Sequence, residues 1–600
     1  MAPNAPKLSD KSIPVNYQYR TPITAPYHSW ITSPARSHAS SGQGKELPLH
    51  LIALILSHLD NVSDLARATR TSRLFYYMTL PRLYEEVTLR SYSDIRYVDG
   101  RPEGYGNGSP FAMGLNTLVS RNYTDYVQTF RVVGDWREHD VEDYSKGRVP
   151  DNSMMLQVAM RAALDKMKNL NAFAWELNTK PLQTIWQGVI NKPSITSLTL
   201  RFQTKRIPRP TTLIPPLPNL KTLVVYDIDP LCYPDDISLL LVHATKLENL
   251  KMHFNPRMRE SGEESVNLVQ FFGRCITARV KLRIKRLALY NLYARNSGDG
   301  FDNCSDPEAA EEFTIVNCMG SSQDPMTVFL DDTWRLTSKH EVPANLKMMR
   351  VDFTDPHHVT MLSRFYGLER MYLVNKKGPR STCSVSTAAT PTTPSLTNTP
   401  SMNGTSSATG TPVTEHQCKT LAGDYLAVIQ SNHRNMRHLL LSDRWSISED
   451  ALSKLFQNCS NLEQIGFAFT VPPLTTLRPL IALVPKLWAL RILIRPNSEF
   501  IEKMDSIDPD IHQFVLATEL WYPEFRNLKY LGLGDKYIYK LGGVVYPQKG
   551  ANGTIPPGQE NSMNARRAGP IRIMKRVDLS EVQDIEIWSM DSTDFDTKWP

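Results

Sequence analysis

The sequence is most informative between residues 47 and 59, where it reads Leu47-Pro48-Leu49-His50-Leu51-Ile52-Ala53-Leu54-Ile55-Leu56-Ser57-His58-Leu59. Five of its apolar residues recur at helical spacing, which places them on one stripe of a short helix: Leu51, Ile52, Ile55, Leu56 and Leu59. Pro48 stands just before this helix, where the missing N–H of proline does no harm. We therefore predict a short amphipathic helix that begins next to Pro48.

Two more short helices are expected directly after the first. Asp60 and Asn61 end the first helix, and Ser63 or Asp64 can cap the second. Residues 72–75 open the third. Three helices of this size cannot bury their apolar stripes against one another alone, so the segment is expected to use a partner surface.

The order and spacing of these residues resemble the F-box, whose outline is Leu-Pro, then Ile-Leu-x-x-Leu, then Asp-Leu, then a basic residue and an aromatic. The matching positions are Leu47-Pro48, Ile55-Leu56 with Leu59, Asp64-Leu65, and Arg73 with Phe75. Two departures exist: polar residues near 69–71 replace the usual Val-Cys pair, and Phe75 stands where Trp is commoner. The sequence that follows, from Pro81 to Val87, looks like the exit seen in fungal F-box proteins. The alternative is a generic helical bundle.

The resemblance implies a partner and a set of docking residues. An F-box docks a Skp-type adaptor, which links it to a cullin-based ubiquitin ligase. The residues expected to contact the adaptor are Leu47, Pro48, Ile52, Ile55, Leu56, Leu59, Leu65 and Phe75. The protein would then be a non-catalytic specificity subunit that raises the effective concentration of target lysines.

Composition excludes several classes of protein. A hydrophobic share of 41% is enough for a large core, and a net charge of +7 over 600 residues is too mild for a general nucleic-acid binder. The 7 cysteines are an odd number, are scattered and form no C-x-x-C pair. This argues against both a disulfide framework and a zinc site.

Targeting signals are also lacking in the sequence. The N-terminus has no long apolar core of a signal peptide, and no apolar run is long enough to cross a bilayer. We therefore expect no membrane partner and a cytoplasmic or nuclear location.

Most of the remaining chain repeats the motif apolar-x-x-apolar-x-apolar. The last two apolar residues of each copy fit a short strand that points them into a core, while the chain returns over the outer face, usually as a helix. These pairs are Phe130/Val132, Phe173/Trp175, Leu198/Leu200, Leu223/Val225, Leu250/Met252, Leu287/Leu289, Met349/Val351, Met371/Leu373, Leu439/Leu441, Ile465/Phe467, Leu490/Ile492 and Leu531/Leu533. Several copies are about 25 residues apart, within the leucine-rich-repeat range of roughly 20 to 29. The predicted fold class is α/β: an F-box followed by an irregular leucine-rich-repeat-like arc, with a non-repeat α/β domain as the alternative.

Gaps in the repeat series divide the chain. The acidic stretch at about 296–341 lacks the pattern of a calcium loop and is expected to be a solvated surface loop. The stretch 378–416 is almost wholly Ser, Thr, Pro, Ala, Gly and Asn, so we expect it to be disordered. The predicted division is a disordered leader (1–44), the F-box (45–90), the first part of the arc (91–377), the disordered insertion (378–416), the second part of the arc (417–546) and a C-terminal segment (547–600).

Catalytic motifs are absent from the sequence. Gly-x-Gly pairs open no P-loop or dinucleotide fingerprint, no Gly-x-Ser-x-Gly elbow is present, and His357-His358 has no partner at ligand spacing. We therefore predict no cofactor, no metal and no enzymatic activity. A ligase-independent F-box scaffold is the chief alternative, and an enzyme built on a misread α/β domain is a distant third.

The strand positions that flank each buried pair should face outward on the concave side of the arc. Arginines and tyrosines are frequent there, and these types make hot spots and bind carboxylate or phosphate. The candidate target-binding residues are Arg201, Tyr226, Lys251, Arg286, Tyr290, Arg350, Arg370, Tyr372, Arg491 and Tyr530. They predict an acidic or phosphorylated protein target, although a soluble face with ordinary charges is an equal alternative. If the stripe is not the site, recognition would move to the convex face, the acidic stretch or the segment around Ile585 to Trp588.

Overall fold

The computed structural model describes residues 47–595 apart from 93, 99, 104–108, 137–140, 147, 203–212, 229–233, 256–265, 268, 292–293, 296–303, 317–344, 353, 355, 376–414, 470–473, 495–497, 547–568 and 594. The predicted leader 1–44 lies outside the described residues, and so does the insertion 378–416 except its last two residues, which begin a helix. The chain divides into two compact units after Arg67.

The first unit contains the beginning of the F-box resemblance. Its helices are α1 (Leu49–Ser57) and α2 (Val62–Ala68), the last residue of which belongs to the second unit. The side chain of Asn61 accepts a hydrogen bond from the backbone N–H of Ser63 at 2.8 Å. The cap of α2 is therefore Asn61, and not Ser63 or Asp64 as the sequence suggested, because an N-cap side chain must precede the N–H groups that it satisfies.

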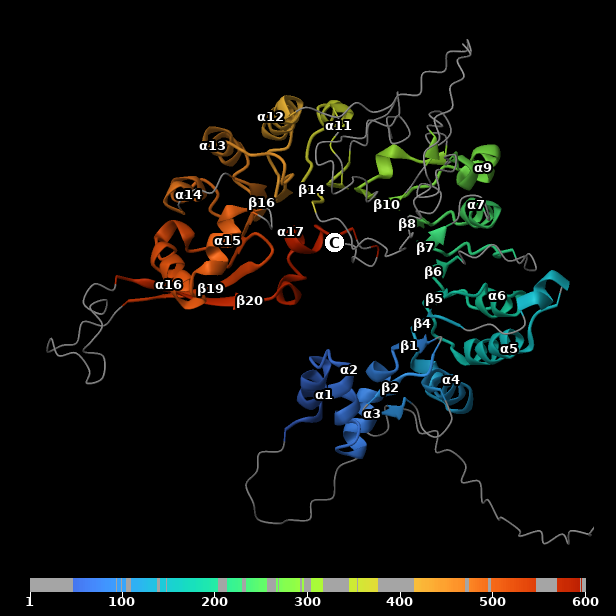
Figure 1. Ribbon diagram of the computed structural model, residues 1–600. Helices are drawn as coiled ribbons and strands as arrows, with labels where there is room; N and C mark the ends of the chain where they lie inside the picture. Colours follow the sequence, from blue (N-terminus) through green and yellow to red (C-terminus); the bar gives the residue numbers. More distant parts are fainter. Residues whose placement is uncertain are drawn as a thin grey trace, which may run out of the picture. The chain divides into compact units, whose positions relative to one another are not determined.

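The second unit is built on a single large sheet, visible as the series of strands in Figure 1. Its strands are β1 (Glu86–Ser91), β4 (Thr129–Gly134), β5 (Ala172–Leu177), β6 (Ser197–Arg201), β7 (Thr222–Ile228), β8 (Asn249–Phe254), β10 (Arg286–Tyr290), β12 (Glu312–Val316), β13 (Met348–Val351), β14 (Arg370–Leu373), β15 (His438–Leu440), β16 (Gln464–Ala468), β17 (Ala489–Leu493), β18 (Tyr530–Leu533), β19 (Tyr537–Val545) and β20 (Ile571–Val577). Two small pairs lie apart from this sheet, β2 (Tyr97–Val98) with β3 (Arg101–Pro102) and β9 (Val266–Asn267) with β11 (Ala294–Arg295).

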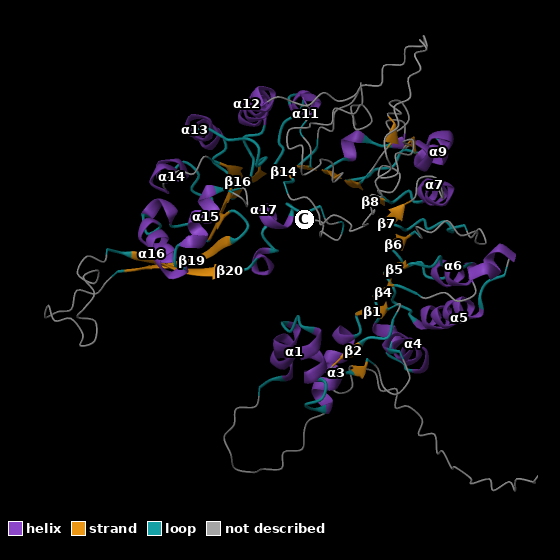
Figure 2. Cartoon of the chain, in the orientation of Figure 1, coloured by secondary structure: helices purple, strands orange, loops and turns teal. Residues whose placement is uncertain are grey.

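The strands follow one another in chain order, and the sheet is open, with β1 and β20 at its two edges. All neighbours from β1 to β18 are parallel, while β18, β19 and β20 are antiparallel. Parallel neighbours need a crossover, and helices supply most of the crossovers on one face of the sheet (Figure 2).

Helix α3 (Arg73–Leu83) begins the second unit and precedes the sheet. The helices that cover the outer face of the sheet are α4 (Pro110–Ser120), α5 (Asp151–Lys166), α6 (Gln183–Ile190), α7 (Pro234–His243), α9 (Val269–Ala278), α11 (Pro356–Leu362), α12 (Glu415–Asn432), α13 (Glu449–Asn458), α14 (Leu474–Ile481), α15 (Glu499–Ser506) and α16 (Pro509–Glu519). Helix α5 shows why they form: Leu156, Met160, Ala163 and Leu164 recur at helical spacing and are all buried. The short helix α17 (Glu586–Ser589) instead lies on the opposite, inner face (Figure 1).

Apolar pairs on neighbouring strands are aligned across the sheet. Leu198 pairs with Leu223, and Leu200 pairs with Val225, in the parallel register of β6 and β7. Every apolar pair predicted from the sequence lies on a strand, apart from Leu441 one residue beyond β15, and every pair belongs to one continuous core on the helix side. A shift by one residue would turn each pair to the other face, so the apolar pattern fixes the register.

A repeated backbone contact joins the strands where they begin. The Glu85 carbonyl accepts hydrogen bonds from the N–H groups of Gln128 and Thr129 at 2.9 and 3.0 Å. The Gln128 carbonyl accepts in turn from Asn171 and Ala172 at 2.8 and 3.0 Å, and the same contact recurs along the sheet as far as β18. It pairs the backbone N–H groups at the start of each strand with a carbonyl at the start of the preceding strand.

Two parts of the predicted division are wrong. The acidic stretch 296–341 is not simply a surface loop, because β12 (Glu312–Val316) lies within it and takes a place in the sheet between β10 and β13. Glu312 is buried and forms ion pairs with Arg286 and Arg370. The segment 547–600 is not separate from the arc either, because β20 completes the same sheet.

Gly134, at the end of β4, provides a test of the β1–β4 contact. Its φ is +109°, and an added Cβ would collide with the backbone carbonyl oxygen of Ser91. We expect Gly134→Ala to lower the free energy of unfolding by about 1–3 kcal/mol, because an L-residue is strained in this conformation. The control is Gly273→Ala in α9, where an added Cβ meets nothing within 4 Å and should stabilise the helix by roughly 0.5–1 kcal/mol. Thermal unfolding of both variants measures the difference, and equal melting temperatures would contradict the expectation.

Candidate functional site

Helix α1 leaves most of its apolar side chains in contact with solvent. Leu47, Leu54 and Ile55 are each 56% exposed, and Pro48 and Leu51 are also exposed. Contiguous exposed apolar surface on a helix is typical of a protein interaction site. Leu54 was missed in the sequence because it lies outside the predicted stripe.

Other predicted docking residues have a different environment. Leu56 and Leu65 are only 7% and 4% exposed, while Ile52, Leu59 and Phe75 are half-buried. The two buried leucines therefore contribute to packing within the chain and have little side-chain surface left for a partner. The exposed members of the predicted set are Leu47, Pro48 and Ile55.

Helix α3 is fixed by a cap at its start and a tyrosine pair near its middle. The Ser72 hydroxyl accepts a hydrogen bond from the Phe75 N–H at 3.1 Å. The hydroxyls of Tyr76 and Tyr123 lie 2.7 Å apart, and this hydrogen bond, together with burial, raises the pKa of Tyr76 to about 12. The Tyr76 hydroxyl therefore stays protonated at neutral pH, and its hydrogen bond with Tyr123 joins α3 to the segment that precedes β4.

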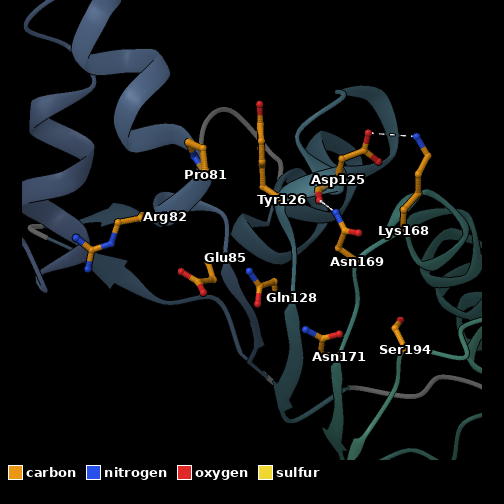
Figure 3. A pocket seen from close by; sticks show the side chains of 10 residues that line it. All are labelled: Pro81, Arg82, Glu85, Asp125, Tyr126, Gln128, Lys168, Asn169, Asn171 and Ser194. Atoms are coloured by element: carbon orange, nitrogen blue, oxygen red, sulfur yellow. Dashed lines mark hydrogen bonds and ion pairs between the residues drawn. The ribbon is translucent and has the colours of Figure 1, made fainter. Parts of the chain in front are cut away.

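An open hollow of about 420 Å³ lies where β1, β4 and β5 begin (Figure 3). Polar side chains line it, and Asp125 accepts hydrogen bonds from Lys168 through its carboxylate and from Asn169 through its backbone carbonyl. The Ser194 hydroxyl, also in the lining, donates to the Leu170 carbonyl at 2.6 Å. The serine is therefore bonded to the backbone and is not poised as a nucleophile.

The inner face of the sheet, opposite the helices, carries the predicted target-binding residues. All of them contact other groups of the same chain. Arg201 pairs with Asp227, Arg286 and Arg370 pair with Glu312, and Tyr530 packs against Trp488. The other six contact the C-terminal segment, which we define as residues 585–593 with Phe595: Tyr226, Lys251, Tyr290, Arg350, Tyr372 and Arg491. Arg370 also contacts this segment through Glu586.

This arrangement corrects the prediction of an outward-facing stripe. The alternation along the strands places these residues on the inner face, but Tyr290, Arg350, Tyr372 and Arg491 are at most 3% exposed. The sequence pattern could not show this, because the residues that cover them are far away in the chain.

Glu586 is an acidic residue of the C-terminal segment that the inner face binds. Its carboxylate lies 2.6 Å from Nδ1 of His438 and 3.6 Å from the Arg370 guanidinium, and it accepts a hydrogen bond from Tyr372. Burial alone would raise the pKa of Glu586, but the hydrogen bonds from His438 and Tyr372 and the Arg370 charge outweigh it and lower the pKa to about 2. The carboxylate is therefore charged at neutral pH. Burial and this neighbouring charge also raise the pKa of Tyr372 well above its usual value.

Asp591 is a further acidic residue of the C-terminal segment and is fully buried. Its carboxylate accepts a hydrogen bond from the Asn375 N–H at 2.6 Å and lies 2.8 Å from Nη2 of Arg491. The same guanidinium nitrogen lies 2.6 Å from Asp535. A buried carboxylate is tolerated only when it is paired in this way.

Metal binding and membrane insertion have no candidate among the described residues. No group of three His, Cys, Asp or Glu side chains in the described ranges could hold a metal ion. Within the same ranges, no helix combines the length and the apolar character that crossing a bilayer requires.

The lowered pKa of Glu586 predicts an acid-sensitive contact. Its folded pKa of about 2 lies below the ordinary value of 4.5, so the contact stabilises the folded state above pH 4.5. This contribution, about 2 kcal/mol after allowance for solvent screening of the partly exposed group, is lost as the pH falls from 4.5 towards 2.

We expect Glu586→Gln to lower the melting temperature at pH 7 and to have a smaller effect at pH 3. Thermal unfolding at both pH values measures this, with Glu581→Gln on the nearby surface as the control. An equal loss at both pH values would contradict an effect that depends on the charge.

Comparison with known proteins accounts for the N-terminal part of this chain. Residues 45–90, which span α1, α2, α3 and most of β1, match the family described as F-box-like. No curated protein matches the chain. The exposed apolar helix α1 lies within the residues that match the F-box-like family. The chain carries an F-box-like domain at residues 45–90.

Proposed function

We propose that the protein is an F-box substrate receptor that binds a Skp-type adaptor and recruits a protein target for ubiquitination by a cullin-based ligase. The observation that carries the proposal is the exposed apolar surface of α1 inside the F-box-like domain. An F-box-like domain suggests adaptor binding, and F-box proteins are generally non-catalytic. The cullin, the target and a cytoplasmic or nuclear location are part of this proposal.

The rest of the chain would act as the target-binding part. We propose that the open sheet is an irregular leucine-rich-repeat-like solenoid, as in some F-box proteins. Its support is the parallel, in-register series of short strands with a helix in most crossovers. A solenoid offers a long surface that can hold a target near a ubiquitin-charged enzyme, so that catalysis would depend on proximity. The likeness of Pro81–Val87 to fungal F-box proteins belongs to the same proposal.

A ligase-independent scaffold is the second candidate, because adaptor binding alone would not distinguish it from a ligase. Affinity purification of the full chain separates the two: recovery of a cullin with the adaptor supports the ligase, and recovery of the adaptor alone supports the scaffold. Recovery of neither would contradict both. Proteins that accumulate when the chain is deleted would identify targets.

Adaptor binding is expected to depend on the exposed leucine and isoleucine of α1. Changing Leu54 and Ile55 to Asp places charge in an apolar interface, and we expect a cost of about 2 kcal/mol or more. The affinity for a purified Skp-type adaptor should therefore fall by about thirtyfold or more. Calorimetric titration measures this loss.

Two comparisons make the result specific. His50→Asp adds a charge to an exposed position of the same helix and should leave adaptor affinity nearly unchanged if the apolar side chains make the contact. Leu56→Asp alters a buried residue and should lower the melting temperature as well. Undiminished binding by the Leu54/Ile55 double variant would remove the adaptor-docking assignment.

A further inference from the structure

The C-terminal segment resembles a peptide bound to the inner face of the sheet. Its contacts extend from Arg491 on β17, through Arg350 on β13, to Lys251 on β8. They cross the strands and do not add a strand to the sheet edge. Side chains of the sheet therefore make the polar contacts, as in a groove that binds a ligand.

The main chain of the segment is bound by sheet side chains. The Gln464 side-chain carbonyl accepts from the Ile587 N–H at 3.1 Å, and Arg491 donates to the Ile587 carbonyl at 2.7 Å. Arg350 donates through Nε to the Met590 carbonyl at 2.9 Å and through Nη2 to the Ser592 carbonyl. Contacts of this kind depend on the path of the backbone, so another peptide that follows the same path can accept them.

Charged contacts add selectivity for acidic side chains. Glu586 and Asp591 lie five positions apart, and each carboxylate lies against an arginine of the inner face and accepts at least one hydrogen bond. Hydrogen bonds between charged groups are about twice as strong as neutral ones. Between the two acids, Ile587, Trp588 and Met590 are buried.

The aromatic ring of Phe595 makes the last contact of the C-terminal segment with the sheet. The Phe595 ring lies 4.2 Å from that of Tyr226 and 5.0 Å from that of Tyr290, both in edge-to-face geometry. The ammonium group of Lys251 lies 4.4 Å from the Phe595 ring centre and donates to the Phe595 carbonyl. This geometry is favourable for both aromatic and cation–π attraction.

The sheet has room for the segment at Gly532. An added Cβ at Gly532 would lie 2.8 Å from the Trp588 ring, so the indole fits only because this inner-face position has no side chain. The apolar side chains of the segment form small clusters that are separate from the main core on the helix side. The main core therefore does not include them.

We propose that the inner face of the sheet from β7 to β18 is a peptide-binding site and that residues 586–593 with Phe595 are its internal occupant. Its outside ligand is a protein segment with two carboxylates five residues apart and apolar side chains between them. The inference rests on the proposed function, because such a segment would belong to the recruited target. Binding of the target requires that the occupant leaves the site.

The test keeps the chain intact while it folds and then frees the segment. A protease site is inserted between Gln583 and Asp584, which are both exposed, and the folded protein is cut there. A fluorescent peptide that copies residues 584–595 is then added, and its anisotropy is measured. We expect the labelled peptide to replace the cut segment and to be competed off by the unlabelled one.

Matched peptides test the role of the acids. Peptides with Glu586→Gln or Asp591→Asn should bind at least tenfold more weakly. The peptide with Asp584→Asn loses the same charge at an exposed position and should bind like the original. Equal affinities of all four peptides would overturn recognition of the carboxylates.

Two further outcomes would overturn the proposal. Absence of exchange in a cut chain that keeps its circular dichroism spectrum would make the segment a permanent part of the fold. Unfolding of the chain on cutting would lead to the same conclusion. Adaptor affinity of the cut chain is measured separately, so a failure of the peptide site with normal adaptor binding leaves the proposed function intact.

Discussion

The parallel register of the sheet is the constraint on which the rest of the second unit depends. Each strand from β4 to β18 must present two apolar side chains to the helices, and the next strand must present its own pair at the same level. Where the strands begin, one backbone carbonyl accepts hydrogen bonds from two N–H groups at the start of the next strand, which fixes the register of neighbouring strands. Because a one-residue slip would expose every pair, this register determines which residues lie on the inner face.

The inner face is populated by the residues that the core does not use, and its charges are paired within the chain. Arg131 pairs with Glu176, and Arg201 pairs with Asp227. Farther along the sheet, carboxylates of the C-terminal segment take this role, and the segment buries the guanidinium groups that it contacts. Arginine forks on this face therefore do bind carboxylates, as their chemistry predicts, but the carboxylates come from the same chain.

In the F-box-like domain, by contrast, apolar side chains stay exposed to solvent. Its first helix is apolar along most of its length, yet Leu56 is its only buried residue. Folding of the chain removes little of the apolar surface of this helix from water. A partner that covers the helix would bury this surface and so stabilise the complex. The two regions thus differ in exposure: α1 has apolar surface exposed to solvent, while the C-terminal segment covers the inner face of β13–β17.

Sequence alone determined the local features. Spacing of apolar residues located the strands of the large sheet from β4 to β18 apart from β12, but not β1, β19 or β20. The Leu-Pro and Ile-Leu pattern located the F-box-like domain that the family comparison confirms. Strand β12 was missed because Phe313 and Ile315 lie in an acidic stretch that suggested a loop. Only the tertiary structure decided that Leu56 and Leu65 are buried, that Leu54 is exposed, and that the C-terminal segment covers Arg350, Tyr372 and Arg491. Periodicity reports which residues share a face of one element, whereas contacts between residues far apart in the chain depend on how the whole sheet places its strands.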